Sequence, residues 1–585
     1  MKKFLYIGLP FLMVMFLLQS LNAQTNVALK IYASVNHQYV SIDTLINNDQ
    51  KSSTPHSIYE FVSTDTPYVF DAPVIIANSV TLIGDTASNG RPPCIQPNVL
   101  TDGSIPGHLF TFTKNSSVVN IQNLYLLGIS VNNSVNWGDG FGITITGDSV
   151  SLHMNNVVME QWGQFGINYS GNHDNFWITN CKFRNFVNPG SDYTGEVLRN
   201  RNDLGAFSTD TLVMKYNTFI GLNGYVAAPV TTRGLKFFDF EHNTVVGVYK
   251  NPFFAMNATN WKCDYNIFYA AYAGGMGNGE YPYWDRIWTP GVGSIIDLDT
   301  LSKINAAIIG ADTSQASSVW ITQAEAKRTI DVSNNIYFTP ANLVSNIQKV
   351  ADTTTAADTI IQVQWMNPLT QSMFANKTTW PGLSANNNLN VDPGFGSGIA
   401  EMIGASGTVP PADGIGMWPW FLESRTNGDV ATHVWGYQIS APDYSSGNWT
   451  PTWPLPEFTS NDLKYSASLT APDGKPYGDP YWFGISTGIK LVSANVPNKF
   501  DLSNNYPNPF NPSTTIKFSL AKSGNVSLKI YNIVGQLVRT VVDNELKNSG
   551  TYEVQVNMDN LASGVYFYNL TQGAQSITKK MILLK

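Results

Sequence analysis

Short apolar stretches alternate with polar positions through the middle of the chain, and many of them share one local pattern. The pattern is an apolar residue, two variable residues, a polar slot, a variable residue and a second apolar residue. Seven segments follow it: VNIQNL (119–124), LHMNNV (152–157), ITNCKF (178–183), MKYNTF (214–219), FEHNTV (240–245), CDYNIF (263–268) and VSNNIY (332–337). Such alternation is typical of strands with one buried face.

The polar slot repeats at spacings that predict a solenoid. It holds Asn in five segments, with Gln122 and Cys181 in the other two, and successive slots lie 33, 26, 36, 26, 23 and 69 residues apart. A unit of about 23–26 residues is typical of one coil of a parallel β-helix. We interpret the longer spacings as coils with inserted loops, and the spacing of 69 as three coils. An array of β-sandwiches explains the alternation but gives no reason to keep Asn at one slot.

The pattern also predicts which side chains point inward. Apolar residues on either side of the slot should fill the core: Ile178, Phe183, Met214, Phe219, Phe240 and Val245. We expect the asparagines to sit where the chain turns between sheets and to hydrogen-bond along the coil axis as a ladder. The residues two and four positions before the slot then face solvent. They form a strip with Lys215, Asp239, Glu241, Lys262 and Asp264 near its middle.

The end of the chain has a different pattern, with strict alternation over residues 499–585. Val526, Leu528 and Ile530 share one face of a predicted strand, and the pattern returns at residues 552–556. This predicts a small antiparallel sandwich. The segment contains Asn-Pro-Phe-Asn-Pro, Tyr-Asn-x-x-Gly-Gln, Gly-Val-Tyr and a Lys-Lys-Met ending, and these motifs resemble the type A sorting domain of the type IX secretion system. The resemblance implies export across an outer membrane by the type IX machinery, with release or attachment at the surface. The alternative is an ordinary immunoglobulin-like module.

The N-terminus agrees with export. Lys2 and Lys3 precede an apolar run from Phe4 to Leu18, followed by a small residue at Ala23. This predicts a cleaved signal peptide over residues 1–23 and no stable membrane span.

The remaining organisation is a solenoid with caps. We expect an N-terminal strand and cap region over 24–64, a parallel β-helix over 65–400 and a loop-rich wrap over 401–490. Asn-Ile-Phe-Tyr, Val-Asp-Pro-Gly-Phe and Asp-Gly-Lys-Pro-x-Gly-Asp-Pro-x-Trp-Phe resemble the pectate-lyase-like β-helix proteins of polysaccharide utilisation systems. The fold class is therefore all-β: a right-handed parallel β-helix followed by a small immunoglobulin-like β-sandwich.

Composition narrows the partners. Only 13% of residues are charged, against about 25% in typical domains. A net charge of −8 argues against nucleic acid, which requires clustered Lys and Arg. Three cysteines leave one disulfide or buried free thiols open, and we favour free thiols.

The resemblance and the strip together direct attention to an extracellular polysaccharide. A lyase of uronic-acid polymers needs a base and a cation that neutralises the sugar carboxylate. The candidates for these catalytic roles are Lys215, Arg199, Arg201 and Arg233, the last within TTRG, which resembles a segment of alginate and chondroitin lyases. Asp239, Glu241 and Asp264 are candidates for binding Ca²⁺, and no organic cofactor is expected.

Aromatic and loop residues supply candidates for substrate binding. Flat rings flanked by polar groups suit sugar faces. The candidates are Trp177, Tyr193, Glu241, Tyr283, Trp284 and Trp288. The aromatic residues have a second interpretation as caps on the end of the solenoid, which fits the tryptophans between 418 and 453 better.

Three hypotheses remain open on the sequence: a lyase, a glycan-binding protein without catalysis, and a structural or adhesive surface protein. In the last case the strip is a solvated face whose charges pair across coils, each pair contributing under about 1 kcal/mol.

Overall fold

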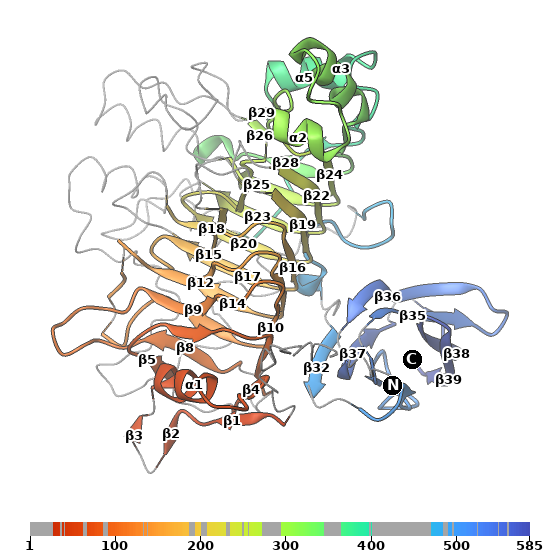
Figure 1. Cartoon of the computed structure of the whole chain (residues 1–585). Helices are drawn as coiled ribbons and strands as arrows, with labels where there is room; N and C mark the ends of the chain where they lie inside the picture. The colour runs from red at the N-terminus through yellow and green to blue at the C-terminus, as the bar shows by residue number, and fades with distance from the viewer. Residues whose placement is uncertain are drawn as a thin grey trace, which may run out of the picture.

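Three all-parallel sheets form the body of the chain. The computed structural model describes residues 27–35, 38–39, 41–62, 67–85, 92–132, 134–136, 138–186, 194–200, 208–229, 234–248, 251–255, 257–271, 294–343, 364–396, 399, 470–483, 489–493, 497–522, 524–547, 549–558 and 561–585. Within these residues the sheets have eleven, ten and six strands, and successive strands of the chain pass from one sheet to the next. Figure 1 shows the strands stacked in layers, as expected for a parallel β-helix.

The strands of each sheet follow in chain order. The eleven-stranded sheet contains β1 (Leu29–Ile31), β4 (Ile58–Phe61), β7 (Val80–Gly84), β10 (Val118–Gln122), β13 (Ser151–Asn155), β16 (Asp174–Thr179), β19 (Ser208–Lys215), β22 (Gly234–Glu241), β24 (Asn260–Asp264), β27 (Thr329–Asp331) and β30 (Leu383–Ser384). The ten-stranded sheet contains β5 (Tyr68–Phe70), β8 (Cys94–Pro97), β11 (Tyr125–Leu127), β14 (Val158–Glu160), β17 (Lys182–Phe186), β20 (Thr218–Leu222), β23 (Thr244–Val248), β25 (Ile267–Ala271), β28 (Ile336–Phe338) and β31 (Leu389–Asn390). The six-stranded sheet contains β6 (Val74–Ile76), β9 (His108–Phe112), β12 (Phe141–Ile145), β15 (Phe165–Tyr169), β18 (Glu196–Asn200) and β21 (Ala227–Ala228).

The predicted inward residues fill one continuous core. Met214, Phe219, Phe240 and Val245 are fully buried, as are Ile178 and Phe183, which confirms the predicted facing. Aromatic rings stack from coil to coil within this core, because parallel strands in register place equivalent side chains directly above one another. Phe183, Phe219 and Phe240 form one such stack. The three cysteines are buried and free, as favoured above.

The corner between the eleven-stranded and ten-stranded sheets is a two-residue turn. Its first residue is left-handed, with φ between 53° and 61° at Asn123, Asn156, Asn180, Tyr216, His242, Tyr265, Asn334 and Asn387. Its second residue is Asn217, Asn243, Asn266, Asn335 or Asn388 in the later coils. Each of these Nδ2 groups except the last donates to the Oδ1 of the asparagine one coil further, at 2.9–3.1 Å. The predicted asparagine ladder is therefore confirmed.

The first two segments of the repeat are wrongly aligned by two residues. The register pairs Met154 with Ile178 and His153 with Trp177, whereas the repeat pattern equates Leu152 with Ile178. The residue that the pattern placed in the slot, Asn155, is the last residue of β13 and lies opposite Thr179, whereas the left-handed turn residue is its neighbour Asn156. Matching by residue type does not distinguish two adjacent asparagines. Because the error is an even number, every residue keeps its face of the sheet.

The interpretation of the spacing of 69 residues as three coils is also wrong. β24 pairs directly with β27, with Lys262 opposite Asp331, so the spacing is one coil that contains a large insertion. The insertion carries α2 (Lys303–Ile308) and α3 (Ser317–Lys327), together with β26 (Ser294–Ile296), which pairs with β29 (Gln364–Met366). The last described coil contains β30 and β31, which pair with β27 and β28.

Helices lie near both ends of the stack, so the described chain is mostly but not entirely β. α1 (Ile42–Gln50) lies beside β5 and β6 at the start of the coil. α2, α3 and α5 (Pro368–Ala375) gather at the other end (Figure 1). Two short strands, β2 (Ser34–Val35) and β3 (Gln38–Tyr39), pair near the beginning. The predicted signal peptide and the tryptophans between 418 and 453 lie outside the described residues.

The C-terminal region is a sandwich of two four-stranded antiparallel sheets. One sheet contains β33 (Asp501–Leu502), β34 (Ser513–Leu520), β37 (Gly550–Asn557) and β32 (Ile489–Ser493). The other contains β36 (Leu537–Lys547), β35 (Gly524–Asn532), β38 (Gly564–Gln572) and β39 (Gln575–Leu583). Val526, Leu528 and Ile530 are fully buried between the sheets, as predicted.

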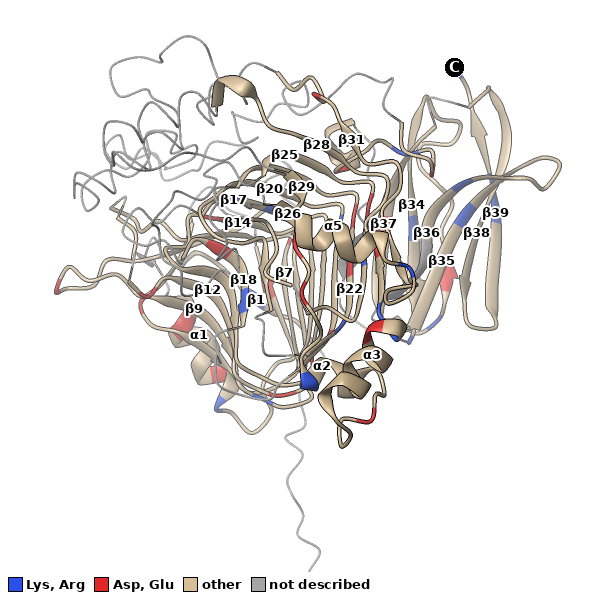
Figure 2. Cartoon of the chain, turned by 90° about the horizontal axis from the view of Figure 1, so that it is seen from above, with Lys and Arg blue, Asp and Glu red and all other residues tan. Residues whose placement is uncertain are grey.

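The sandwich lies beside the eleven-stranded sheet in both views (Figures 1 and 2). Its apolar cluster extends to Ile58 and Ile83, on the first coils of that sheet. Figure 2 also shows how sparsely charged residues are distributed over the described chain.

Candidate functional site

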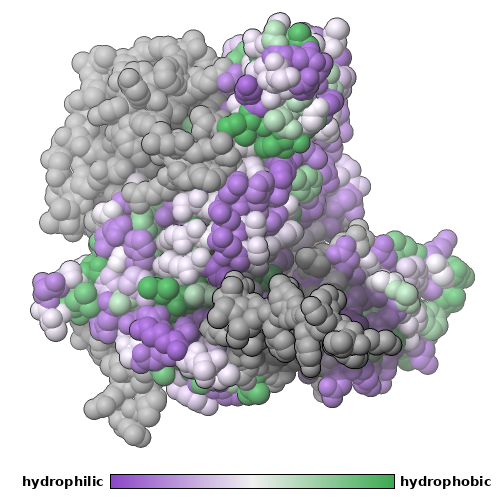
Figure 3. Space-filling view, in the orientation of Figure 1, coloured by the Kyte–Doolittle hydropathy of each residue, from purple (hydrophilic) through white to green (hydrophobic). Residues whose placement is uncertain are grey.

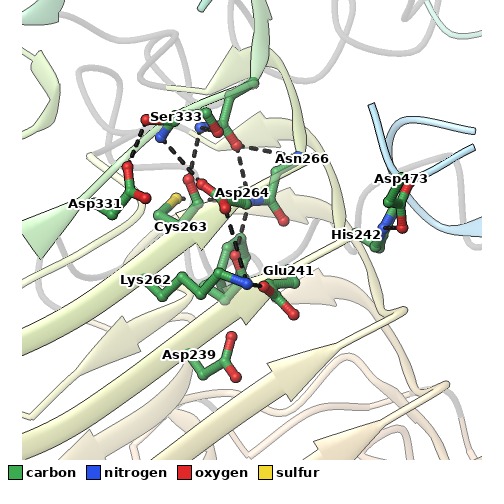
Figure 4. Close-up of polar contacts among 12 residues, drawn as sticks. Asp239, Glu241, His242, Lys262, Cys263, Asp264, Asn266, Asp331, Ser333 and Asp473 are labelled. Atoms are coloured by element: carbon green, nitrogen blue, oxygen red, sulfur yellow. Dashed lines mark hydrogen bonds and ion pairs between the residues drawn. The ribbon is translucent and has the colours of Figure 1, made fainter. Parts of the chain in front are cut away.

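The predicted strip forms on the outer face of the eleven-stranded sheet. β19, β22 and β24 are adjacent strands, so they place Lys215 opposite Glu241, and Glu241 opposite Asp264. Two residues earlier on the same strands, Asp239 lies opposite Lys262. The cluster expected from the sequence is therefore a real neighbourhood, shown in part in Figure 4.

The charges of the strip pair with one another across coils. Lys215 Nζ lies 2.6 Å from Asp239 Oδ2 and 2.6 Å from Glu241 Oε2. Lys262 Nζ contacts Glu241 Oε1 and lies 3.8 Å from Asp264 Oδ2. The Lys262 side chain is 44% exposed and that of Lys215 is 26% exposed, so water screens these pairs. This is the arrangement of a face whose charges neutralise each other.

Asp264 is the electrostatically unusual member of the strip. Its side chain is only 5% exposed, and its Oδ1 accepts a hydrogen bond from the backbone N–H of Ser333 at 3.1 Å. Burial, and then the nearby carboxylate of Asp331, raise the pKa of Asp264 to about 6. Asp264 therefore changes charge in mildly acidic conditions.

These carboxylates do not converge on a metal position. Within the described ranges, no group of three or more His, Cys, Asp or Glu side chains is arranged to hold a metal ion. Asp239 and Glu241 are turned toward lysine ammonium groups, whereas calcium needs several oxygens aimed at one point. The residues present do not fit the Ca²⁺ site that the sequence proposes.

The aromatic candidate Trp177 stands next to a residue that sequence reasoning missed. The rings of His153 and Trp177 stack with centroids 4.5 Å apart and an angle of 3° between them. Burial, with a smaller contribution from Lys547, lowers the pKa of His153 to about 4, so the imidazole is neutral at ordinary pH. One face of the indole is covered by this stack. The two-residue error in aligning the repeat hid this pair, because it did not place His153 opposite Trp177.

The remaining candidates are not joined to the strip. Arg199 lies on β18 of the six-stranded sheet, and its NH1 group lies 3.2 Å from Oε1 of the buried Glu196. Lys215 lies on the eleven-stranded sheet, so the two proposed catalytic cations are on different sheets of the coil. The other candidates lie outside the described residues: Arg201, Arg233, Tyr193, Tyr283, Trp284 and Trp288.

A segment far along the chain closes over the corner that carries the asparagine ladder. We call residues 470–483 the strap; it ends in the 3-10 helix η2 (Pro480–Phe483). His242 Nε2 lies 2.9 Å from Asp473 Oδ2, and His242 Nδ1 lies 3.0 Å from the carbonyl oxygen of Pro476 (Figure 4). Burial by itself would raise the pKa of Asp473, but the hydrogen bond and charge of His242 lower it to about 2.

The strap continues onto the first row of the ten-stranded sheet. Asp479 Oδ2 accepts a hydrogen bond from Thr218 at 2.7 Å, and Trp482 Nε1 donates to the same hydroxyl at 2.8 Å. Lys182 Nζ lies 3.6 Å from the centre of the Tyr481 ring. The Asp-Gly-Lys-Pro motif marks this segment in the sequence, but its docking position depends on residues more than 200 positions earlier.

Comparison with known proteins places the C-terminal sandwich. Residues 504–584 match the family described as the secretion system C-terminal sorting domain. The chain thus carries a type IX sorting domain and is exported to the cell surface or beyond. No curated protein and no solved structure matches the chain. Among the described residues, no helix is long and apolar enough to cross a membrane.

Proposed function

We propose that the protein is exported to bind an extracellular polysaccharide through the outer faces of a right-handed parallel β-helix of the pectate-lyase-like type. The observation that supports this is the unbroken row of side chains on the eleven-stranded sheet. In one row, Asn120, His153, Trp177, Val213, Asp239, Lys262 and Asp331 follow each other in register. Neighbours in such a row are about 4.8 Å apart. A rigid, regularly spaced row suits a ligand that itself repeats.

The geometry favours binding over β-elimination. A lysine that abstracts a proton must present a free amine to the sugar, but Lys215 donates to two carboxylates. Arg199, the cation proposed to neutralise a sugar carboxylate, lies on another sheet and is paired with Glu196. The handedness rests on the rule that parallel crossovers are right-handed in about 98% of cases. We infer an immunoglobulin-like topology for the sorting domain, following its resemblance.

Binding of the full chain to a panel of soluble polysaccharides tests this function. Trp177→Ala and Lys262→Ala should each weaken the interaction, whereas Tyr32→Ala, at an exposed aromatic residue away from the strip, should not. The same samples should be followed for the ultraviolet absorbance of unsaturated uronides. Absence of binding to every polymer would refute the proposal, and a rise in absorbance that requires Lys215 would replace binding by a lyase activity.

A further inference from the structure

A second polar row lies on the outer face of the six-stranded sheet. The register places Thr111, Thr144, Asn168 and Arg199 opposite one another on β9, β12, β15 and β18. Their neighbours along the strands, such as Ile143, Ile167 and Leu198, are buried in the core. Since side chains alternate across a strand, the polar row points outward. Neither the repeat pattern nor the resemblance indicated Thr144 or Asn168.

The row runs from an open surface to a covered one. Ile75, at its first position, is 50% exposed, whereas Thr144 and Asn168 are each 8% exposed and Ala228 at the far end is fully buried. Thr144 and Asn168 therefore face away from the core, although their side chains are nearly buried. Figure 3, in the orientation of Figure 1, shows hydrophilic residues in purple among paler ones over the described part of the solenoid.

Within this row, Asn168 has the unusual hydrogen-bonding state. Its Oδ1 atom is buried and has no hydrogen-bond partner within the described chain. An amide left in this state costs about 1–3 kcal/mol of stability. Nearly all buried polar groups in proteins are hydrogen-bonded, so an exception calls for an explanation such as a ligand or a bound water. The ladder residues Asn217, Asn243 and Asn266 of later coils show the alternative, in which a buried amide is hydrogen-bonded to the adjacent coil.

The groups around Asn168 are polar, and the one cation of the row is paired with a carboxylate. Thr144 Oγ1 lies 3.4 Å from His108 Nδ1, and His108 Nε2 lies 3.2 Å from Asp139 Oδ2. On the other side of the row, the charge of Arg199 is opposed by Glu196. The row therefore offers an amide and hydroxyls, and its arginine is already paired with Glu196.

We propose that Thr144 and Asn168 form a binding subsite for a neutral, hydroxyl-rich sugar unit. A sugar hydroxyl both donates and accepts, so neighbouring hydroxyls satisfy Asn168 Oδ1 and its NH₂ group together. The carboxylate of an acidic sugar would find no unpaired cation in this row, because Arg199 is paired with Glu196. The inference rests on the proposed polysaccharide-binding function and narrows its ligand to the neutral class.

The test compares affinity with stability in the full chain. Xylan, mannan and a soluble β-glucan serve as neutral probes, and alginate and pectate serve as acidic ones. Asn168→Leu and Thr144→Val should each reduce affinity for the neutral polymer at least about tenfold. Thr322→Val, on the exposed face of α3, is the matched control and should bind as the wild type does. Because Leu removes an unpaired amide at similar volume, Asn168→Leu should melt no lower than the wild type.

Each alternative result has a definite meaning. If the wild type binds a glycan and both variants bind equally well, Asn168 is satisfied by water alone and the subsite is refuted while the proposed function stands. If Asn168→Leu melts lower, the amide has a structural role and the subsite is again refuted. Binding restricted to alginate or pectate overturns the neutral class, and a wild type that binds no polymer overturns the subsite and the function together.

Discussion

Buried asparagines in two parts of the solenoid behave in opposite ways. At the corner between the eleven-stranded and ten-stranded sheets, Asn217, Asn243 and Asn266 are fully buried, and each amide is bonded to the coil before and the coil after. On the six-stranded sheet, Asn168 is almost as buried but its Oδ1 has no partner in the described chain. Asn168 and the ladder asparagines are all buried, and all lie in rows that repeat from coil to coil. They differ in whether the side-chain amide has its hydrogen-bond partners.

The difference indicates how a solenoid divides its polar residues between stability and recognition. A ladder asparagine stabilises because its partner is supplied by the next coil, at a distance set by the backbone. An amide in a row whose neighbours are Thr and Arg has no such partner. The following predictions test this contrast, beginning with the largest expected effect.

Removing one ladder amide should be the most damaging change. Asn243→Ala deletes the acceptor of the Asn217 backbone N–H and side chain, and the donor to the carbonyl of Met214. We expect a loss of about 2–5 kcal/mol in the free energy of unfolding, because several buried groups become unpaired together. Denaturant titration measures it. Asn156→Ala, at an exposed left-handed position of the same corner, should cost much less, and equal losses would contradict the ladder account.

The strap offers a matched pair of glycines. Gly474 and Gly478 both have positive φ, but a Cβ at Gly478 would lie 2.4 Å from Thr244 Oγ1, whereas nothing lies within 4 Å of one at Gly474. Both alanine variants should lose about 1 kcal/mol from backbone strain. Only Gly478→Ala should also expose the strap to proteases, as limited proteolysis would show. Equal protection in both variants would mean that the strap does not depend on this contact.

Acidification should stabilise the strip at Asp264. Its folded pKa of about 6 exceeds that of an unfolded Asp, so the folded state binds the extra proton and stability rises as pH falls from about 6 to about 4. Asp264→Asn should remove this dependence and gain about 1–2 kcal/mol above pH 7. Melting temperatures of both proteins across this range provide the measurement. A wild type with the same pH profile as the variant would show that Asp264 titrates normally.

The smallest effect on the free energy of unfolding is expected at Asn168. Asn168→Leu should change the free energy of unfolding by less than about 1 kcal/mol, and in the stabilising direction, because an unpaired amide is replaced by an apolar group. Denaturant titration beside Asn243→Ala gives the sharpest form of the contrast. A loss as large as that of Asn243→Ala would abolish the distinction between the two sets.

The repeat was predictable because its physical cause is local. Alternation places apolar residues such as Met214 and Phe240 in the core of any sheet that forms, and an Asn at regular spacing indicates a turn that recurs. The offset at Met154 and the single coil between Cys263 and Val332 were not predictable in this way. An asparagine that ends a strand, such as Asn155, looks like a turn asparagine in sequence, and an insertion of any length fits between stacked strands.

The candidate site was only partly predictable for a related reason. The register of adjacent strands brings Lys215, Asp239 and Glu241 together, and facing alone anticipated that cluster. Which ammonium pairs with which carboxylate depends on side-chain geometry across three coils. The stacking of His153 on Trp177, the docking of the strap and the isolation of Asn168 all depend on residues that are distant in the chain.

The sequence by itself determined that this protein is exported, that its body is a coil of short strands and that its end is a sorting domain. Those features follow from local motifs, from the period of two within each strand and from the period of about 24 residues between strands. All of these can be read from the sequence without knowing which residues are in contact. Only the tertiary structure decided which polar residues are satisfied and which are not. Hydrogen-bond partnership is a property of pairs, and in a solenoid the partner of a residue lies a full coil away.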